Sequence, residues 1–222
     1  MGHFNIIQLI IIWAPPVLFA ITLHEVAHGW VARRLGDPTA HMLGRLTLNP
    51  LKHIDPVGTI IVPAVLFASM LLFHTGFLFG WAKPVPIAPR NFKHPRRGMA
   101  IVAVAGPLAN LAMGIFWAII MRLAFLLHPS FPWLDLLIYM GFAGVSINIV
   151  LLVFNLIPLP PLDGGRVLVG LLPRNAANVV DRIEPYGFYI IILLLFIGAF
   201  NVILTPPIMW LSQLLLPGGL IS

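Results

Sequence analysis

The sequence lacks cysteine altogether and contains few charged residues. Of its 222 residues, 13 are Lys or Arg and 7 are Asp or Glu, so 9% are charged, whereas about a quarter is typical of a soluble domain. Without cysteine the chain can form neither disulfides nor thiolate ligands, so a metal site would have to use His, Asp or Glu. With so little charge, most of the chain must face lipid or another apolar surface.

Basic residues are missing from the N-terminal part of the chain. No Lys or Arg precedes Arg33, so the first apolar run lacks the positive start of a cleaved signal peptide and is expected to be retained. The basic residues that follow cluster in loops and contribute to a net charge of +6. This pattern favours the cytoplasmic flanks of a membrane protein over nucleic-acid binding. We therefore expect a lipid bilayer, and no nucleic acid, among the partners.

Hydrophobic sequence is abundant: 59% of the residues are hydrophobic and the mean hydropathy is +0.98. Five apolar segments lie at about 4–30, 57–81, 99–127, 134–156 and 187–216. Each has roughly the ~20 residues that a membrane helix requires, so we expect a single domain, residues 1–222, with an all-α polytopic membrane fold. Pro15-Pro16 should kink the first segment or start a new helix, and Pro206-Pro207 should break the last one.

Basic loops predict how these segments are oriented. Arg33 and Arg34 follow the first segment and Arg166 follows the fourth, so both segments should run from the outside to the cytoplasmic face. The second segment has basic residues on both flanks, and charge leaves open whether it crosses the membrane or re-enters it. A multi-pass protein of the cell membrane is expected.

Two stretches between the first and third apolar segments are predicted to be extended. Residues 44–48 alternate polar and apolar side chains, as a short strand does. Residues 83–87 contain Pro84 and Pro86, which favour extended backbone and are tolerated at a sheet edge. Together they predict a short membrane-associated β element.

The first apolar segment contains the sequence His24-Glu25-Val26-Ala27-His28. Residues four apart share a helix face, so His24 and His28 can bind one metal ion together. Glu25 lies between them and can act as general base on a water that the metal activates. Because ionisable groups are costly in apolar segments, this motif is a candidate functional site.

Two imidazoles do not complete a catalytic zinc site, because a third protein ligand is required. The extended zinc-protease pattern fails, since Val31 and Arg34 occupy the positions of its glycine and its final histidine. The other acidic residues lie in predicted loops or at segment edges, apart from Asp163 at the cytoplasmic end of the fourth segment. Asp163 lies shortly before Arg166, as His24 lies before Arg34. The two groups should therefore lie at similar depths, and Asp163 is the candidate third ligand.

Three motifs together resemble the site-2 protease family of intramembrane zinc metalloproteases. They are the HEVAH sequence, Gly106-Pro107-Leu108-Ala109-Asn110, and the run from Asn155 to Leu162-Asp163-Gly164. The resemblance covers about residues 15–175, the expected catalytic core. Many family members carry PDZ or CBS domains, and this chain is expected to be a minimal form without them.

The resemblance implies a zinc-dependent endopeptidase that hydrolyses a peptide bond in a transmembrane segment of a membrane-protein substrate. Cleavage is expected near the cytoplasmic face, in a bacterial plasma membrane. One Zn²⁺ per chain is implied on His24, His28 and Asp163, with Glu25 as general base. Asn155 is implied to stabilise the oxyanion or to hold substrate. The sequence identifies neither the substrate nor the oligomeric state.

Two asparagines in these motifs also have structural roles open to them. Asn110 is expected to hydrogen-bond between closely packed helices, beside the small residue Gly106. Asn155 could likewise cap a helix or bond between helices rather than act in catalysis.

An alternative to proteolysis is a transporter or channel. In that case His24, Glu25, His28 and Asp163 would form a metal-ion or proton path. The sequence shows no paired inverted repeat that would support it. A catalytically silent scaffold is a third possibility, which the intact Glu25 disfavours.

Overall fold

The computed structural model describes residues 5–62, 64–65 and 80–216, and this part of the chain consists of helices and irregular connections without a strand. Its α-helices are α1 (Ile6–Arg34), α2 (Thr39–Met42), α4 (Pro95–Leu127), α5 (Asp135–Asn155), α6 (Asp163–Leu171), α7 (Arg174–Phe196) and α8 (Ala199–Leu215). Shorter helical turns are η1 (Pro50–Lys52), η2 (Pro56–Ile61), η3 (Pro89–Asn91) and η4 (Pro132–Leu134). The predicted helical class is confirmed.

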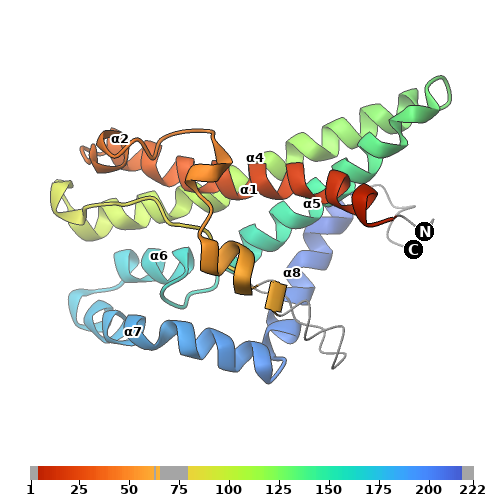
Figure 1. Ribbon diagram of the computed structural model, residues 1–222. Helices are drawn as coiled ribbons and strands as arrows, with labels where there is room; N and C mark the ends of the chain where they lie inside the picture. The colour runs from red at the N-terminus through yellow and green to blue at the C-terminus, as the bar shows by residue number, and fades with distance from the viewer. Residues whose placement is uncertain (1–4, 63, 66–79, 217–222) are drawn as a thin grey trace.

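Three of these helices, α1, α4 and α5, are long and apolar enough to cross a membrane. They lie side by side (Figure 1), and α4 packs against both α1 and α5. Glycines let α4 and α5 approach closely: a Cβ on Gly144 would lie 2.2 Å from Trp117 Cγ, and one on Gly141 would lie 2.5 Å from Met121 Cβ. Small residues at helix crossings are typical of packing in membranes.

The first, third and fourth predicted segments correspond to these three helices. α1 does not restart at its prolines, because it continues through Pro15 and Pro16 as one helix of 29 residues. Asn5 caps its start by accepting the Gln8 N–H at 2.9 Å. Most of the second predicted segment, 57–81, lies outside the described residues, so its expected crossing or re-entry stays a prediction.

The fifth predicted segment divides into two helices, but not at the expected residues. α7 ends before Gly198, whose φ of +72° is left-handed, and α8 continues through Pro206 and Pro207. Left-handed backbone favours glycine and ends a helix, so Gly198 makes the corner instead of the proline pair. The two helices meet at 83°, as a broken span or a re-entrant loop would. The described residues thus contain three candidate spans, or four if α7 and α8 form one.

The predicted β element is not confirmed, because residues 45–48 and 81–88 form no strand. We call residues 81–91 the strap. Its prolines at 84, 86 and 89 have no N–H to donate to a ladder, and the Lys83 N–H donates to the His53 carbonyl oxygen at 2.9 Å. The Arg45 side chain donates to the Lys83 carbonyl oxygen at 3.0 Å. The Arg45 side chain therefore connects the two segments that were predicted to pair through backbone hydrogen bonds.

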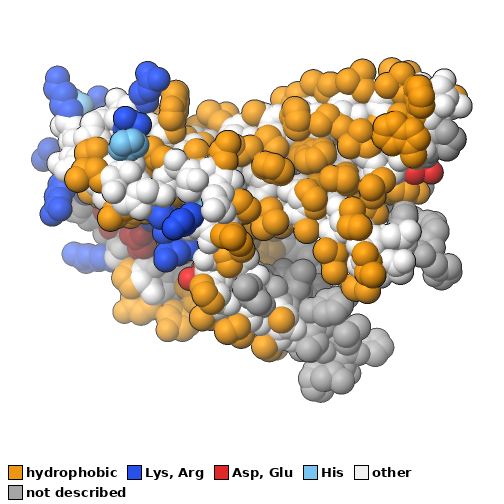
Figure 2. Space-filling model, turned by 45° about the horizontal axis from the view of Figure 1, so that its top comes forward, with side chains coloured by type: hydrophobic (Ala, Val, Ile, Leu, Met, Phe, Trp, Pro, Cys, Tyr) orange, Lys and Arg blue, Asp and Glu red, His pale blue; other side chains and the backbone are white. Residues whose placement is uncertain are grey.

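Lys and Arg side chains gather at one end of the molecule (Figure 2), where α1 ends and α4 begins. Arg33 and Arg34 occupy the last turn of α1, and hydrophobic side chains cover most of the remaining visible face. Asp135 pairs with His128 at 2.9 Å where α4 gives way to α5. This one-sided distribution of basic residues agrees with a multi-pass membrane protein.

Candidate metal centre

Two histidines lie on the buried face of α1. Buried positions of this helix recur every four residues and so form one stripe: Ile12, Pro16, Ala20, His24, His28 and Ala32. The two imidazole rings meet edge to face, with their centroids 4.6 Å apart. The stripe therefore directs both rings into the interior of the bundle, one helical turn apart.

Asp163 reaches the histidines from the first residue of α6. Gly164 and Gly165 allow the helix to begin there. A Cβ on Gly164 would lie 2.3 Å from the Leu156 carbonyl oxygen, and one on Gly165 would lie 2.3 Å from the Pro160 nitrogen. Only glycine fits such close contacts with backbone, so this glycine pair lets the Asp163 carboxylate face α1.

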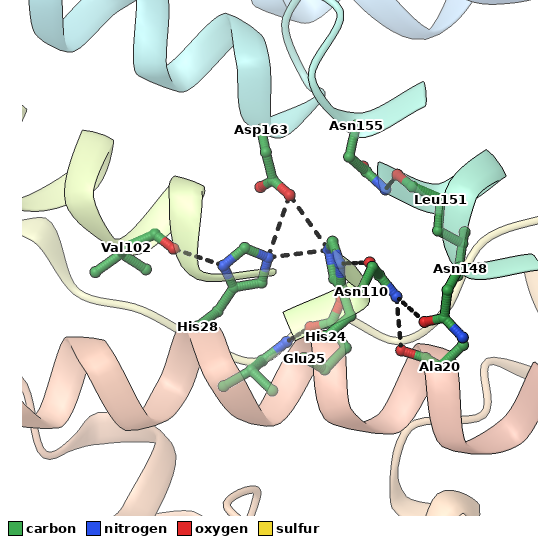
Figure 3. A network of polar contacts seen from close by, with 11 residues as sticks. Ala20, His24, Glu25, His28, Val102, Asn110, Asn148, Leu151, Asn155 and Asp163 are labelled. Carbon is green, nitrogen blue, oxygen red and sulfur yellow. Dashed lines mark hydrogen bonds and ion pairs between the residues drawn. The ribbon is translucent and has the colours of Figure 1, made fainter. Parts of the chain in front are cut away.

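Three side-chain atoms converge between α1 and α6 (Figure 3). Asp163 Oδ2 is 3.2 Å from His24 Nε2 and 3.3 Å from His28 Nε2, and the two Nε2 atoms are 3.0 Å apart. All three residues are buried. Bonds of about 2.0–2.1 Å to a tetrahedral zinc ion set the ligand atoms about 3.4 Å apart, so the observed spacing suits one ion.

Hydrogen bonds on the far side of each ring identify the protonated nitrogen. His24 Nδ1 is 2.6 Å from Asn110 Oδ1, and His28 Nδ1 is 2.7 Å from the Val102 carbonyl oxygen. Both partners are acceptors, so each Nδ1 carries the hydrogen and each Nε2 presents a lone pair. Asp163 Oδ2 has no hydrogen-bond donor among the described residues and adds a third lone pair. Lone pairs this close repel one another unless a cation lies among them, so this donor set fits a zinc ion.

Asn110 belongs to a series of buried amides that joins α1, α4 and α5. Its Nδ2 donates to the Ala20 carbonyl oxygen at 3.3 Å and to Asn148 Oδ1 at 2.9 Å, and Asn148 Nδ2 donates to the Gly144 carbonyl oxygen at 2.8 Å. These donations leave Asn110 Oδ1 facing His24, and the expected interhelical bonding by Asn110 is confirmed. Asn148 is absent from the sequence-based candidates, although an amide in an otherwise apolar helix requires a buried partner.

Gly106 leaves the space that the two imidazoles occupy. A Cβ at this position on α4 would lie 2.4 Å from His28 Nε2 and 2.5 Å from His24 Cε1. The sequence predicted close helix packing here. The structure adds that the surfaces packed on this glycine are the metal-ligand candidates themselves.

Glu25 is not one of the three converging groups. Its half-buried side chain accepts a hydrogen bond at Oε2 from the Val85 N–H at 2.7 Å, across 60 residues of sequence. Val85 lies in the strap and is buried. The side chain of the candidate base, which α1 carries (Figure 3), is thus bonded to the strap.

Asn155 makes its side-chain hydrogen bond within its own helix. Its Nδ2 donates to the Leu151 carbonyl oxygen at 2.9 Å, one turn back along α5. In Figure 3 its amide points towards Leu151 rather than towards the three converging atoms. The catalytic role of Asn155 stays a prediction.

Gly106→Ala should prevent zinc binding, because the added methyl would overlap both imidazoles. We expect bound zinc to fall from about one ion per chain to near zero, as measured by metal analysis of the purified protein. Gly114→Ala on the same helix is the control, because its nearest atoms would lie 3.7 Å away and its zinc content should be kept. Equal zinc in the two variants would contradict this account of Gly106.

Asn110→Leu should weaken zinc affinity by about 10–100-fold, the usual effect of losing a residue that orients a metal ligand. Leucine has a similar volume but no acceptor for His24 Nδ1. Affinity is measured by competition with a chelating dye. Asn155→Leu is the matched control, since its amide bonds only within α5 among the described residues, and its affinity should match the wild type. If both variants behave alike, Asn110 does not orient His24.

The chain is similar to known proteins over most of its length. The model of "Peptidase family M50" matches residues 128–198. "Putative zinc metalloprotease YwhC" of Bacillus subtilis is 39% identical over 183 residues, which cover 82% of this chain and 78% of the relative. "Putative zinc metalloprotease Rip2" of Mycolicibacterium smegmatis is 30% identical over 184 residues, which cover 83% and 66%. No solved structure matches. The chain therefore belongs to peptidase family M50, the site-2 protease family of zinc metalloproteases.

Proposed function

We propose that this zinc metalloprotease is an intramembrane endopeptidase that hydrolyses a peptide bond in a transmembrane segment of a membrane-protein substrate. The observation that carries the proposal is the convergence of His24, His28 and Asp163. These groups are buried among apolar helices that are long enough to cross a membrane. A substrate that reaches such a site must itself enter the bilayer.

Peptide hydrolysis at this site would require a metal ion that acts as a Lewis acid and residues that transfer protons and hold the substrate. One Zn²⁺ on the three ligands would supply a Lewis acid that acidifies water and polarises the scissile carbonyl. Glu25 accepts the proton of the attacking water and returns it to the leaving amine. The Val85 N–H holds the Glu25 carboxylate at 2.7 Å for that transfer. Asn155 stabilises the oxyanion or holds substrate once its amide releases the Leu151 carbonyl oxygen.

Basic residues support a cut near the cytoplasmic face. His24 lies ten residues before Arg34, or about 15 Å along a helix. Asp163 is followed by Arg166 three residues later. Lys and Arg gather at one end (Figure 2), and the positive ends of membrane proteins face the cytoplasm. Because both relatives named above are bacterial, we infer a bacterial plasma membrane.

The strap is suited to holding an unwound substrate segment. A helical substrate hides its carbonyl groups in i→i−4 hydrogen bonds, so it must unwind before cleavage. The strap adjoins Glu25 through Val85, and the Ile87 N–H makes no hydrogen bond to a described residue. An extended peptide could accept that N–H by strand addition. The segment predicted as a strand would then become one only with substrate bound.

The rival function, a transporter or channel, is not favoured. Both relatives are named as zinc metalloproteases. Within the described residues, His24, His28 and Asp163 are the one group of three or more side chains that could hold a metal. No series of such groups leads across the membrane in that part of the chain.

Glu25→Gln should keep zinc and lose cleavage. Glutamine retains an oxygen for the Val85 N–H but is a poor proton acceptor, so cleavage of a model transmembrane substrate should fall by at least about 100-fold. Bound zinc, measured on the same preparation, should stay at the wild-type level. Wild-type cleavage by the variant would contradict the proposed base, and metal-dependent transport without proteolysis in either protein would favour the rival function.

Ile87→Pro removes the Ile87 N–H, which no described residue accepts, and should raise KM for the substrate by roughly 3–10-fold, the value of one hydrogen bond. Zinc content and kcat should change little, because Glu25 and the metal ligands are untouched. Steady-state cleavage over a range of substrate concentrations gives both constants. Ile87→Ala keeps the N–H and serves as control. A KM in Ile87→Pro equal to that of Ile87→Ala would rule out strand addition at this residue.

A further inference from the structure

We propose that Asp37 is a positioning residue for the reaction: it anchors the strap and thereby holds the Val85 N–H against Glu25. The inference rests on the proposed function, because it takes Glu25 as the general base. Asp37 lies beyond the end of α1 and is not among the metal-ligand candidates. Asp37 would influence catalysis indirectly, through the backbone of the strap between Ala88 and Val85.

Asp37 is a buried carboxylate that joins two separate parts of the chain. The residue is 0% exposed. Its Oδ2 accepts the Ala88 N–H at 2.7 Å, and its Oδ1 accepts Asn91 Nδ2 at 2.7 Å. Oδ1 also accepts the N–H and the hydroxyl of Thr39. The strap is therefore tied at two residues to one side chain.

The charge of Asp37 strengthens these ties. Burial raises the pKa of Asp37, but hydrogen bonds from Thr39, Ala88 and Asn91 outweigh burial and hold that pKa below its usual range. The side chain is thus ionised at neutral pH and accepts hydrogen bonds at both oxygens. Bonds to an ionised acceptor are stronger than bonds between neutral groups.

Asp37 is also fixed relative to α1, the helix that carries Glu25. The Asp37 N–H donates to the Ala32 carbonyl oxygen at 2.9 Å, in the last turns of α1. Gly36 allows this tight turn, because its φ of +104° is in the left-handed region. Asp37 therefore moves with α1, and its ties to Ala88 and Asn91 fix the strap relative to the same helix.

Little flexible backbone separates the anchor from Val85. Ala88 is three residues beyond Val85, and Pro86 between them has a restricted φ. On the other side, the Lys83 N–H donates to the His53 carbonyl oxygen at 2.9 Å. Val85 is 6% exposed. The backbone around Val85 is thus fixed on both sides, at Lys83 and at Ala88. These contacts restrict the direction of the Val85 N–H, which donates to Glu25.

Holding Glu25 matters because a glutamate side chain has several rotamers, and proton transfer requires one of them. A displacement of about 1 Å in a reacting group can lower the rate by 100-fold. Loosening the strap would leave the Glu25 carboxyl group and the candidate metal ligands in place. It would lower the fraction of time in which the carboxylate is aimed at the water.

Asp37→Asn tests this inference, because both Asp37 oxygens accept hydrogen bonds. In asparagine one of these oxygens is replaced by an NH₂ group, which cannot accept them. We expect kcat for a model transmembrane substrate to fall by about 10–100-fold, while KM and zinc per chain stay within about 2-fold of the wild type. Asp135→Asn is the matched control, since Asp135 pairs with His128 away from the strap, and its kcat should be unchanged. Asn91→Ala removes one tie only and should lower kcat less, which keeps the test informative if Asp37→Asn folds poorly.

A double-mutant cycle with Val85→Pro identifies the route, because proline removes the N–H itself. If Asp37 acts through that N–H, adding Asp37→Asn to Val85→Pro should change kcat by less than about 2-fold. Independent losses in the double variant would overturn the route. A rise in KM alone, as expected for Ile87→Pro, or unchanged kcat in both Asp37→Asn and Asn91→Ala would overturn the inference. Glu25→Gln is assayed alongside to distinguish failure of this inference from failure of the proposed function. Cleavage by Glu25→Gln would refute Glu25 as the general base, and the inference about Asp37 would fall with it.

Discussion

Three lone pairs within 3.0–3.3 Å of one another, inside a bundle of apolar helices, are the constraint on which the rest of the structure depends. Such a cluster is unfavourable unless a cation neutralises it. Each helix around it carries a feature that permits the convergence. α1 has buried positions every four residues, α4 has Gly106 where a methyl would strike both rings, and α6 begins on the Gly164-Gly165 pair. Together these features bring the three side chains to one point, as a shared metal ion would require.

The groups that hydrogen-bond the two candidate histidine ligands are neutral, which suits a site buried among apolar helices. Asn110 and the Val102 carbonyl oxygen accept from the two imidazoles, where many zinc sites use a carboxylate. A divalent ion bound here would be balanced by the Asp163 and Glu25 carboxylates. A further carboxylate behind either histidine would leave uncompensated charge among apolar helices. Neutral acceptors still fix the imidazole tautomer, and Asn148 in turn holds the Asn110 amide.

Local patterns predicted the first, third and fourth helices, because a long apolar run in a membrane protein has few other ways to satisfy its backbone. They also singled out the two histidines, Glu25 and Asp163, since ionisable groups are rare in such runs. They did not reveal Asn148 or the role of Gly106, which depend on where α1 and α5 meet α4. The predicted strands were not confirmed for a related reason: extended residues form a ladder only if their N–H groups find strand partners. Those of Lys83 and Val85 go to a loop carbonyl and to Glu25.

The need to satisfy backbone N–H groups also explains the composition of the strap. Irregular backbone near a membrane is tolerated where every N–H is satisfied or where it lines a wet cavity. Prolines at 84, 86 and 89 remove three donors outright. Carboxylates accept two others, Glu25 that of Val85 and Asp37 that of Ala88. Ile87 is left with a donor that no described residue accepts. The Ile87 N–H, two residues from Val85, is therefore a donor that the backbone of an unwound substrate could use.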